Sequence, residues 1–216
     1  MAHYAPSVFE FADPVRPDLL DALRRAWDEI AGPGAWWTGE ERVAIATVGR
    51  AARAGGRATR AELLPDAANE AATVIGGDPS RPSEDWVDSI TAAIGEECYV
   101  ELTGVVGRVV AVDTFTRLLG EDLQPFPPAR PGEPSRERPA EPLRKNRTWV
   151  SMGSMAAPPF VLAAVPPAVR AMNDLAEAMY LTPQQMADPD IRRGELHRTQ
   201  IELVAATVSH VNECFY

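Results

Sequence analysis

Residues 17–31 read Pro-Asp-Leu-Leu-Asp-Ala-Leu-Arg-Arg-Ala-Trp-Asp-Glu-Ile-Ala. Apolar side chains recur through this stretch at helical spacing, as Leu19, Leu20, Leu23, Ala26, Trp27 and Ile30. Strict apolar and polar alternation over the length of a strand is hard to find anywhere in the chain. The sequence therefore predicts an all-α fold, with helices at about 17–31, 38–54, 59–75, 83–94, 96–119, 166–181 and 196–211.

Three helix starts are recognisable in the sequence. Thr38 with Glu41, and Thr59 with Glu62, fit the capping box, in which the two side chains satisfy backbone N–H groups of the first turn. Thr182 is followed by proline at the first helical position and by Gln185. Each pattern predicts a helix that begins just after its threonine.

Proline divides the chain into parts. Residues 124–142 cannot form a helix interior and favour extended backbone, because they carry Pro125, Pro127, Pro128, Pro131, Pro134, Pro139 and Pro142. We expect an N-terminal helical half at 1–123, a proline-rich connector at 124–148 and a C-terminal helical half at 149–216, within one structural domain. A ligand for an adaptor domain is the alternative reading of the connector.

Composition excludes several classes of function. The 216 residues carry a formal net charge of −10 without a basic stripe, which disfavours binding to nucleic acid. No apolar run approaches the length of a membrane span, and the N-terminus does not resemble a secretory signal, so we expect a cytoplasmic protein without a membrane partner. His3 and His197 have no companion at metal-ligand spacing, and we predict neither a metal nor a cofactor.

Two segments of the chain share a pattern. Val100-Glu101-Leu102 begins a stretch that runs to Phe115, and Ile201-Glu202-Leu203 begins one that runs to Tyr216. In this alignment Glu101 pairs with Glu202, and Asp113 pairs with Cys214. Duplication of a helical half is one explanation, and the shared periodicity of any two amphipathic helices is the other. If the segments are duplicates, the first copy has no sulfur at the paired position and is structural.

The candidate site consists of Glu202 and Cys214. A reactive cysteine needs a lowered pKa or a nearby base, but twelve residues of straight helix would separate this pair by roughly 18 Å. We therefore predict that the helix breaks between them, with Asn212 in the left-handed conformation that ends helices. His210 is a possible auxiliary in proton exchange. Glu202 as a solvated helix position, and Cys214 as a small buried residue, are the structural alternatives.

The other cysteine is a poor candidate. Cys98 follows Glu96 and Glu97, whose negative charges raise the pKa of a neighbouring thiol. With only two cysteines, a disulfide-stapled scaffold is not expected. We therefore interpret Cys98 as an unreactive thiol.

A family resemblance rests on the C-terminal residues. Arg198-Thr-Gln-Ile-Glu202, followed by Val208-Ser209 and Asn212-Glu-Cys214-Phe-Tyr216, resembles the carboxymuconolactone decarboxylase-like superfamily in its alkylhydroperoxidase D-like branch. The segment from Trp36 to Ala52 is similar to the glutamate-arginine helix of such proteins. The resemblance implies an all-helical bundle that forms homo-oligomers, and a cysteine pair that reduces hydroperoxides with a lipoyl or thioredoxin-like partner.

The resemblance also implies roles for single residues. Glu202 corresponds to the proton-relay glutamate, and Cys214 to the first cysteine of a Cys-x-x-Cys pair. The second cysteine, which attacks the peroxide, and a histidine four residues beyond it would fall after Tyr216. We therefore expect little or no turnover from residues 1–216 alone.

Two other functions stay open. The superfamily also contains decarboxylases and lactone enzymes, which need polar groups that hold a carboxylated ring, and the sequence shows no convincing histidine and arginine cluster for that purpose. A non-catalytic helical protein that binds or assembles in an oligomer is the remaining alternative.

Overall fold

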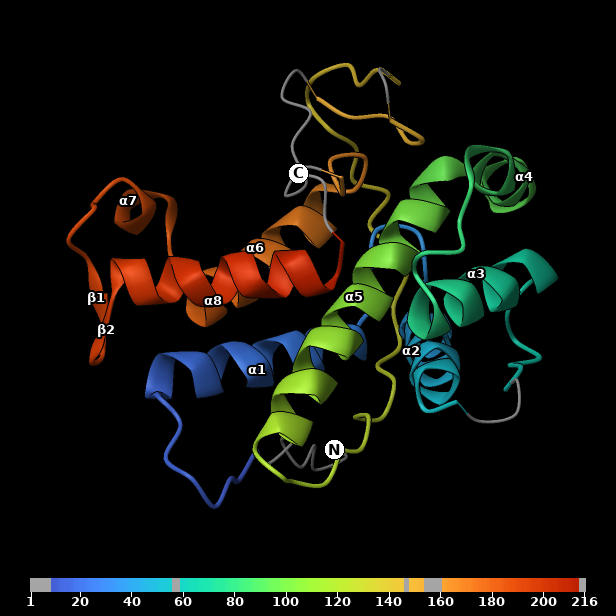
Figure 1. Ribbon diagram of the computed structural model, residues 1–216. Coiled ribbons are helices and arrows are strands. Elements are labelled where there is room, and N and C mark those ends of the chain that lie inside the picture. Colours follow the sequence, from blue (N-terminus) through green and yellow to red (C-terminus); the bar gives the residue numbers. More distant parts are fainter. Residues whose placement is uncertain (1–8, 56–58, 146–147, 154–160, 214–216) are drawn as a thin grey trace. The chain divides into compact units, whose positions relative to one another are not determined.

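The computed structural model describes residues 9–55, 59–145, 148–153 and 161–213. The contacts divide the chain into two compact units, Met1–Leu175 and Ala176–Tyr216, and the proline-rich connector belongs to the first. The predicted helical fold is confirmed, with a single two-stranded hairpin as the exception within the described ranges (Figure 1). The helices are α1 (Pro17–Ile30), α2 (Gly39–Arg53), α3 (Asp66–Gly77), α4 (Glu84–Ile94), α5 (Glu96–Leu118), α6 (Pro166–Met179), α7 (Pro183–Met186) and α8 (Arg198–Val211), and the strands are β1 (Arg192–Arg193) and β2 (Leu196–His197).

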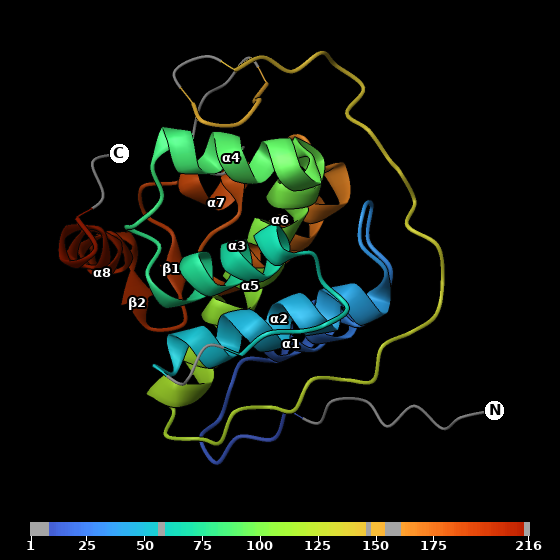
Figure 2. The same ribbon diagram turned by 90° about the vertical axis from the view of Figure 1, so that its right-hand side faces the viewer.

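Helix α5 is the central element of the first unit and contacts α1, α2, α3 and α4 (Figures 1 and 2). Its sequence explains this position, because apolar residues surround its whole circumference and no polar stripe faces solvent over most of its length. Twelve of its residues are buried, and they include the charged side chains of Glu101, Arg108 and Asp113.

Two of the three predicted caps are confirmed. At α2, the Glu41 N–H donates to Thr38 Oγ1 at 3.3 Å, and the Thr38 N–H donates to Glu41 Oε2 at 2.8 Å. At α7, Thr182 and Gln185 form the same reciprocal pair.

The third predicted start, at Thr59, is wrong. Helix α3 begins only at Asp66, after Pro65, because a residue that precedes proline is disfavoured in the helical region. The loop before it is held by the Asn69 side chain, whose amide bonds the backbone of Ala61 at 2.8 and 3.0 Å and the Leu64 carbonyl at 3.0 Å.

Helices α2 and α3 approach each other at a pair of glycines. A Cβ atom built on Gly76 would lie 2.4 Å from the backbone oxygen of Gly49 and 2.7 Å from its Cα atom. Only a residue without a side chain fits there, so the glycines set how closely these two helices pack.

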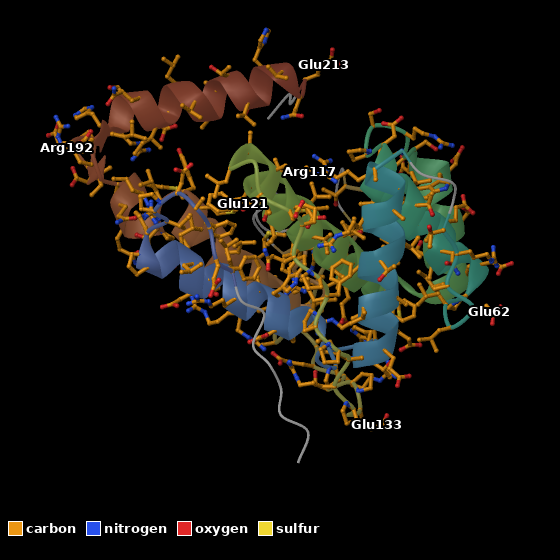
Figure 3. All side chains as sticks on the ribbon, turned by 90° about the horizontal axis from the view of Figure 1, so that it is seen from below. Glu62, Arg117, Glu121, Glu133, Arg192 and Glu213 are labelled. Atoms are coloured by element: carbon orange, nitrogen blue, oxygen red, sulfur yellow. The ribbon has the colours of Figure 1, made fainter. Side chains whose placement is uncertain are left out.

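The connector is extended, as its prolines predict, but it is bonded to the helices rather than left as a free spacer. The Arg130 N–H donates to the Ala31 carbonyl at 2.7 Å, and the Ser135 N–H donates to the Gly34 carbonyl at 2.9 Å. Phe126 stacks on Trp27 with 5.1 Å between the ring centroids. Figure 3 shows Glu133 of the connector projecting away from the first unit. The connector therefore forms one wall of the first unit.

The second unit contains the end of α6 and everything that follows it. The hairpin of β1 and β2 turns at Gly194, whose φ of 59° is readily adopted by glycine, and two-residue strands give no alternation by which the sequence could have predicted them. Arg193 donates to the carbonyls of Glu177 and Ala178 at 3.0 and 2.8 Å, which ties the hairpin to the end of α6. Figure 3 shows Arg192 and Glu213 near opposite ends of α8.

No helix in the described ranges combines the length and the apolar character that crossing a membrane requires.

Candidate functional site

Glu202 lies in the second turn of α8 and is held by two donors. The Tyr180 hydroxyl donates to Glu202 Oε1 at 2.5 Å, and Arg198 Nε donates to the same oxygen at 2.6 Å. The Tyr180 hydrogen bond, followed by the Arg198 contacts, lowers the pKa of the Glu202 carboxyl. Its side chain is 43% exposed. Glu202 is therefore an ionised, accessible carboxylate at neutral pH.

The two donors are themselves fixed by their surroundings. Arg198 Nη1 donates to the Met186 carbonyl at 2.8 Å, which connects the start of α8 to the end of α7. Burial, followed by the hydrogen bond to Glu202, raises the pKa of Tyr180. The Tyr180 hydroxyl consequently stays protonated and donates a hydrogen bond to the carboxylate.

The end of α8 differs in detail from the prediction. The helix ends at Val211, but Asn212 has φ −88° and ψ 7°, and the left-handed residue is Glu213 with φ 52°. Cys214, the predicted sulfur of the site, lies outside the described residues. Glu202 and Val211 are nine residues apart on one helix, so about 13.5 Å separates them along the axis.

The predicted auxiliary residue lies far from Glu202. His210 is exposed in the last turn of α8, eight residues after Glu202. At 1.5 Å per residue the separation along the axis is about 12 Å, so the helix does not bring the two side chains together.

Cys98 lies at the start of α5 and is half-buried. Burial, with a smaller effect of the nearby Glu101 carboxylate, raises the pKa of this thiol to about 11. The direction agrees with the prediction, although burial contributes more than Glu97 does. A thiol with this pKa is almost wholly protonated at neutral pH and is a weak nucleophile.

A buried charged cluster in the first unit was not predicted. Glu101 and Arg42 are each about 3% exposed at their side chains, and Arg42 Nε lies 3.5 Å from Glu101 Oε1. The Trp36 N–H donates to Glu101 Oε2 at 2.6 Å, and Arg42 Nη1 donates to the Gly32 carbonyl at 2.9 Å. The loop between α1 and α2 can approach Glu101 because Gly34 has no side chain. A Cβ atom at this position would lie only 1.7 Å from Glu101 Oε1.

A second arginine joins the cluster from α5. Arg108 is 1% exposed, donates to Glu29 Oε2 at 2.8 Å and donates through Nε to the Gly104 carbonyl at 3.2 Å. Burial raises the pKa of Glu101, and burial together with the charge of Arg108 lowers the pKa of Arg42 to about 10. Burial therefore outweighs the mutual attraction of the pair. The signal for this cluster was present in the sequence, because Glu101 and Arg108 are charged residues in a helix that is apolar all round.

The residue paired with Cys214 in the two-segment alignment has a structural role. Asp113 accepts two hydrogen bonds from Arg50, at 2.8 and 2.7 Å, and its side chain is almost fully buried. Arg50 also donates to the Gln124 carbonyl at 2.9 Å and lies 3.8 Å from the ring centroid of Phe126. This ion pair fastens the connector to α2 and α5.

In the described part of the chain, no three histidine, cysteine, aspartate or glutamate side chains gather into a possible metal-ligand set.

Comparisons with protein-family models, with curated proteins and with solved structures find no match to this chain.

Proposed function

We propose that the chain is a thiol oxidoreductase of the alkylhydroperoxidase D-like type, in which Cys214 supplies one sulfur of a pair and Glu202 takes part in proton transfer. The single observation that best supports this proposal is the Glu202 cluster. A partly exposed carboxylate that accepts hydrogen bonds from Tyr180 and Arg198 is ionised and fixed in position.

The proposed reaction is the two-electron reduction of a hydroperoxide by a pair of thiols. A thiolate attacks an oxygen of the hydroperoxide, the O–O bond breaks, the sulfur is oxidised to sulfenic acid, and the alcohol leaves with a proton. This first sulfur is that of the second cysteine of the pair, and the thiol of Cys214 then displaces water from its sulfenic acid to form a disulfide. A lipoyl or thioredoxin-like dithiol partner reduces that disulfide and is itself oxidised.

The role of Glu202 follows from its contacts. A carboxylate with a lowered pKa is a weak base, so Glu202 acts less by removing a proton itself than by orienting the Tyr180 hydroxyl as part of a relay. Tyr180→Phe should then impair proton transfer while leaving the ion pair of Glu202 with Arg198 in place.

The alternative of decarboxylation is less well supported. The first unit does contain two neighbouring arginines, Arg42 and Arg108, which the sequence alone did not bring together. Both already face carboxylates, of Glu101 and Glu29, and so offer no excess positive charge to a carboxylated lactone.

Thiol labelling tests the proposal on residues 1–216. An ordinary thiol has a pKa of about 8.5, whereas Cys98 has about 11, so the thiolate fractions at pH 7 differ by about 300-fold. Cys214 should therefore react with iodoacetamide at least about 100 times faster than Cys98, with Cys98→Ser and Cys214→Ser chains as controls. Equal, slow labelling of the two thiols would argue for a structural protein.

Turnover provides the second arm of the test. A chain extended after Tyr216 by a cysteine, with a histidine four residues beyond it, should consume tert-butyl hydroperoxide with a dithiol donor, whereas residues 1–216 should not. The matched control carries serine in place of the added cysteine. Equal activity of all three chains would contradict the mechanism.

A further inference from the structure

The buried charged cluster of the first unit lines a cavity of about 230 Å³. Its polar side is formed by Arg42, Glu101 and Arg108, and an ion pair between Glu137 and Arg170 borders it. The remaining wall is mainly apolar and is formed by Pro33, Ala35, Val165, Pro167 and Ala168. At about 30 Å³ for each water-sized group, the cavity of about 230 Å³ has room for a ligand of up to about seven non-hydrogen atoms.

Two polar atoms in this cavity lack hydrogen bonds. Arg42 Nε and Glu101 Oε1 are buried, and neither has a hydrogen-bond partner among the described residues. They lie 3.5 Å apart, which is close enough for charge attraction but does not meet the geometry of a hydrogen bond. A buried donor or acceptor without a hydrogen bond costs free energy. A ligand group that accepts a hydrogen bond from Arg42 and donates one to Glu101 would remove both costs.

The charges in the cavity are already balanced. Arg42 faces Glu101, Arg108 donates to Glu29 at 2.8 Å, and Arg170 donates twice to Glu137 at 2.8 Å. A free anion or cation bound against Arg42 and Glu101, whose side chains are about 3% exposed, would leave one net charge at the buried end of the cavity, and that is costly. The balance therefore favours a neutral ligand.

We propose that this cavity binds the hydroxyl group of a small, mainly apolar alcohol or hydroperoxide. The hydroxyl oxygen would accept from Arg42 Nε, the hydroxyl proton would be donated to Glu101 Oε1, and the carbon body would contact the apolar wall. An alcohol and a hydroperoxide share this donor and acceptor pattern. Binding of a hydroperoxide would identify the substrate class of the proposed thiol peroxidase, and this part of the inference rests on that proposed function. Binding of an alcohol does not depend on it.

Four compounds with the same tert-butyl body test the proposal: tert-butanol, tert-butyl hydroperoxide, tert-butyl methyl ether and pivalate. Binding is measured by ligand-observed NMR on the Cys214→Ser chain, so that the result does not depend on turnover. For five or six non-hydrogen atoms, we expect a Kd on the order of 1 to 10 mM for the alcohol, the hydroperoxide or both. The ether, which cannot donate, and pivalate, which is charged, should bind at least ten times more weakly.

Glu101→Gln should change the preference of the site. The substitution leaves Arg42 without its carboxylate, so pivalate should bind at least ten times more tightly than to the unsubstituted site. Ser135→Trp provides a second variant on an exposed residue that lines the cavity, and it should weaken tert-butanol binding at least ten-fold. Ser89→Trp, on the exposed surface of α4, is the matched control and should bind tert-butanol normally.

The outcomes separate the two proposals. Binding of the alcohol or the hydroperoxide that is lost in Ser135→Trp supports the cavity site, whether or not the extended chain shows peroxidase turnover. Tert-butanol binding in preference to the hydroperoxide identifies alcohols as the ligands, and the reverse identifies hydroperoxides. Absence of binding by both at 50 mM, on the order of ten times the expected Kd, would overturn the inference, and so would pivalate or the ether binding as tightly as tert-butanol.

Discussion

Replacing Gly76 by alanine should force α2 and α3 apart. The new Cβ atom would lie 2.4 Å from the Gly49 oxygen, whereas an ordinary contact begins at 3.4 Å, so the helices must separate by about 1 Å (3.4 minus 2.4). The atoms in the way belong to the backbone, and no side-chain rotation can remove the overlap. A gap of about 0.5–1 Å removes about a quarter to a half of the dispersion energy of each contact across it, so the α2 and α3 interface would lose that share.

The expected magnitude combines a cost and a gain. Overpacking of this kind costs about 2–4 kcal/mol, and alanine is favoured over glycine in a helix by about 1 kcal/mol. The free energy of unfolding should therefore fall by about 1–3 kcal/mol. For a unit of 175 residues, at about 2–4 °C for each kcal/mol, that corresponds to a thermal midpoint lowered by about 2–12 °C.

The neighbouring glycine provides a matched control. A Cβ atom on Gly77 would lie 3.5 Å from the Ala52 side chain, which is an ordinary contact, so Gly77→Ala should leave the thermal midpoint unchanged or raise it slightly. Both variants are compared by urea and thermal unfolding, followed by circular dichroism at 222 nm, the usual helix signal. If the two substitutions change stability equally, the reasoning about the α2 and α3 contact is refuted.

Two further predictions concern charged groups. Asp113→Ala leaves the Arg50 guanidinium without its carboxylate and should lower the free energy of unfolding by about 2–4 kcal/mol. The control is Asp88→Ala, which breaks an exposed pair with Lys145 and should cost less than about 1 kcal/mol. Similar costs for the two variants in urea titrations would show that burial of the first pair is unimportant. Because burial raises the folded-state pKa of Glu101, its contribution to stability is fully present below its unfolded pKa of about 4.3 and is lost as pH rises through the folded pKa. Glu202 should behave in the opposite sense, since its lowered pKa makes its contribution present above about 4.3 and lost as pH falls. Both signs are checked by measuring the free energy of unfolding of the native, Glu101→Gln and Glu202→Gln chains between about pH 3 and pH 8. This range begins below the reference pKa of about 4.3 and extends about four units above it. Parallel curves for all three chains would contradict the prediction.

The helices could be predicted because their signals are local. The reciprocal bonds of Thr38 with Glu41 depend on four consecutive residues, and the all-apolar character of α5 is visible within one segment. The Thr59 pattern does not start α3, because Pro65 disfavours helical backbone at the residue before it, and the helix begins only at Asp66. Local patterns therefore fix most helices but not the choice between competing starts.

The cavity could not be predicted because its members are far apart in the chain. Arg42 and Glu101 are separated by 59 positions, and the loop that contains Gly34 brings them together through contacts that no periodicity encodes. The sequence did mark Glu101 as unusual, since it is a charged residue surrounded by apolar ones. It did not indicate which cation would lie opposite it.

The contrast between Glu101 and Glu202 bears on how far an alignment can assign chemistry. The two glutamates occupy the same position in the aligned segments, but burial raises the pKa of Glu101, whereas Tyr180 and Arg198 lower that of Glu202. The helices that carry them also differ, because α5 continues through Asp113 to Leu118, while α8 ends at Val211, which aligns with Val110. Glu101 is thus suited to holding a neutral hydroxyl at the buried end of a cavity, and Glu202 to orienting a proton donor near solvent. Neighbouring residues rather than aligned position therefore determine which of these carboxylates can take part in thiol chemistry.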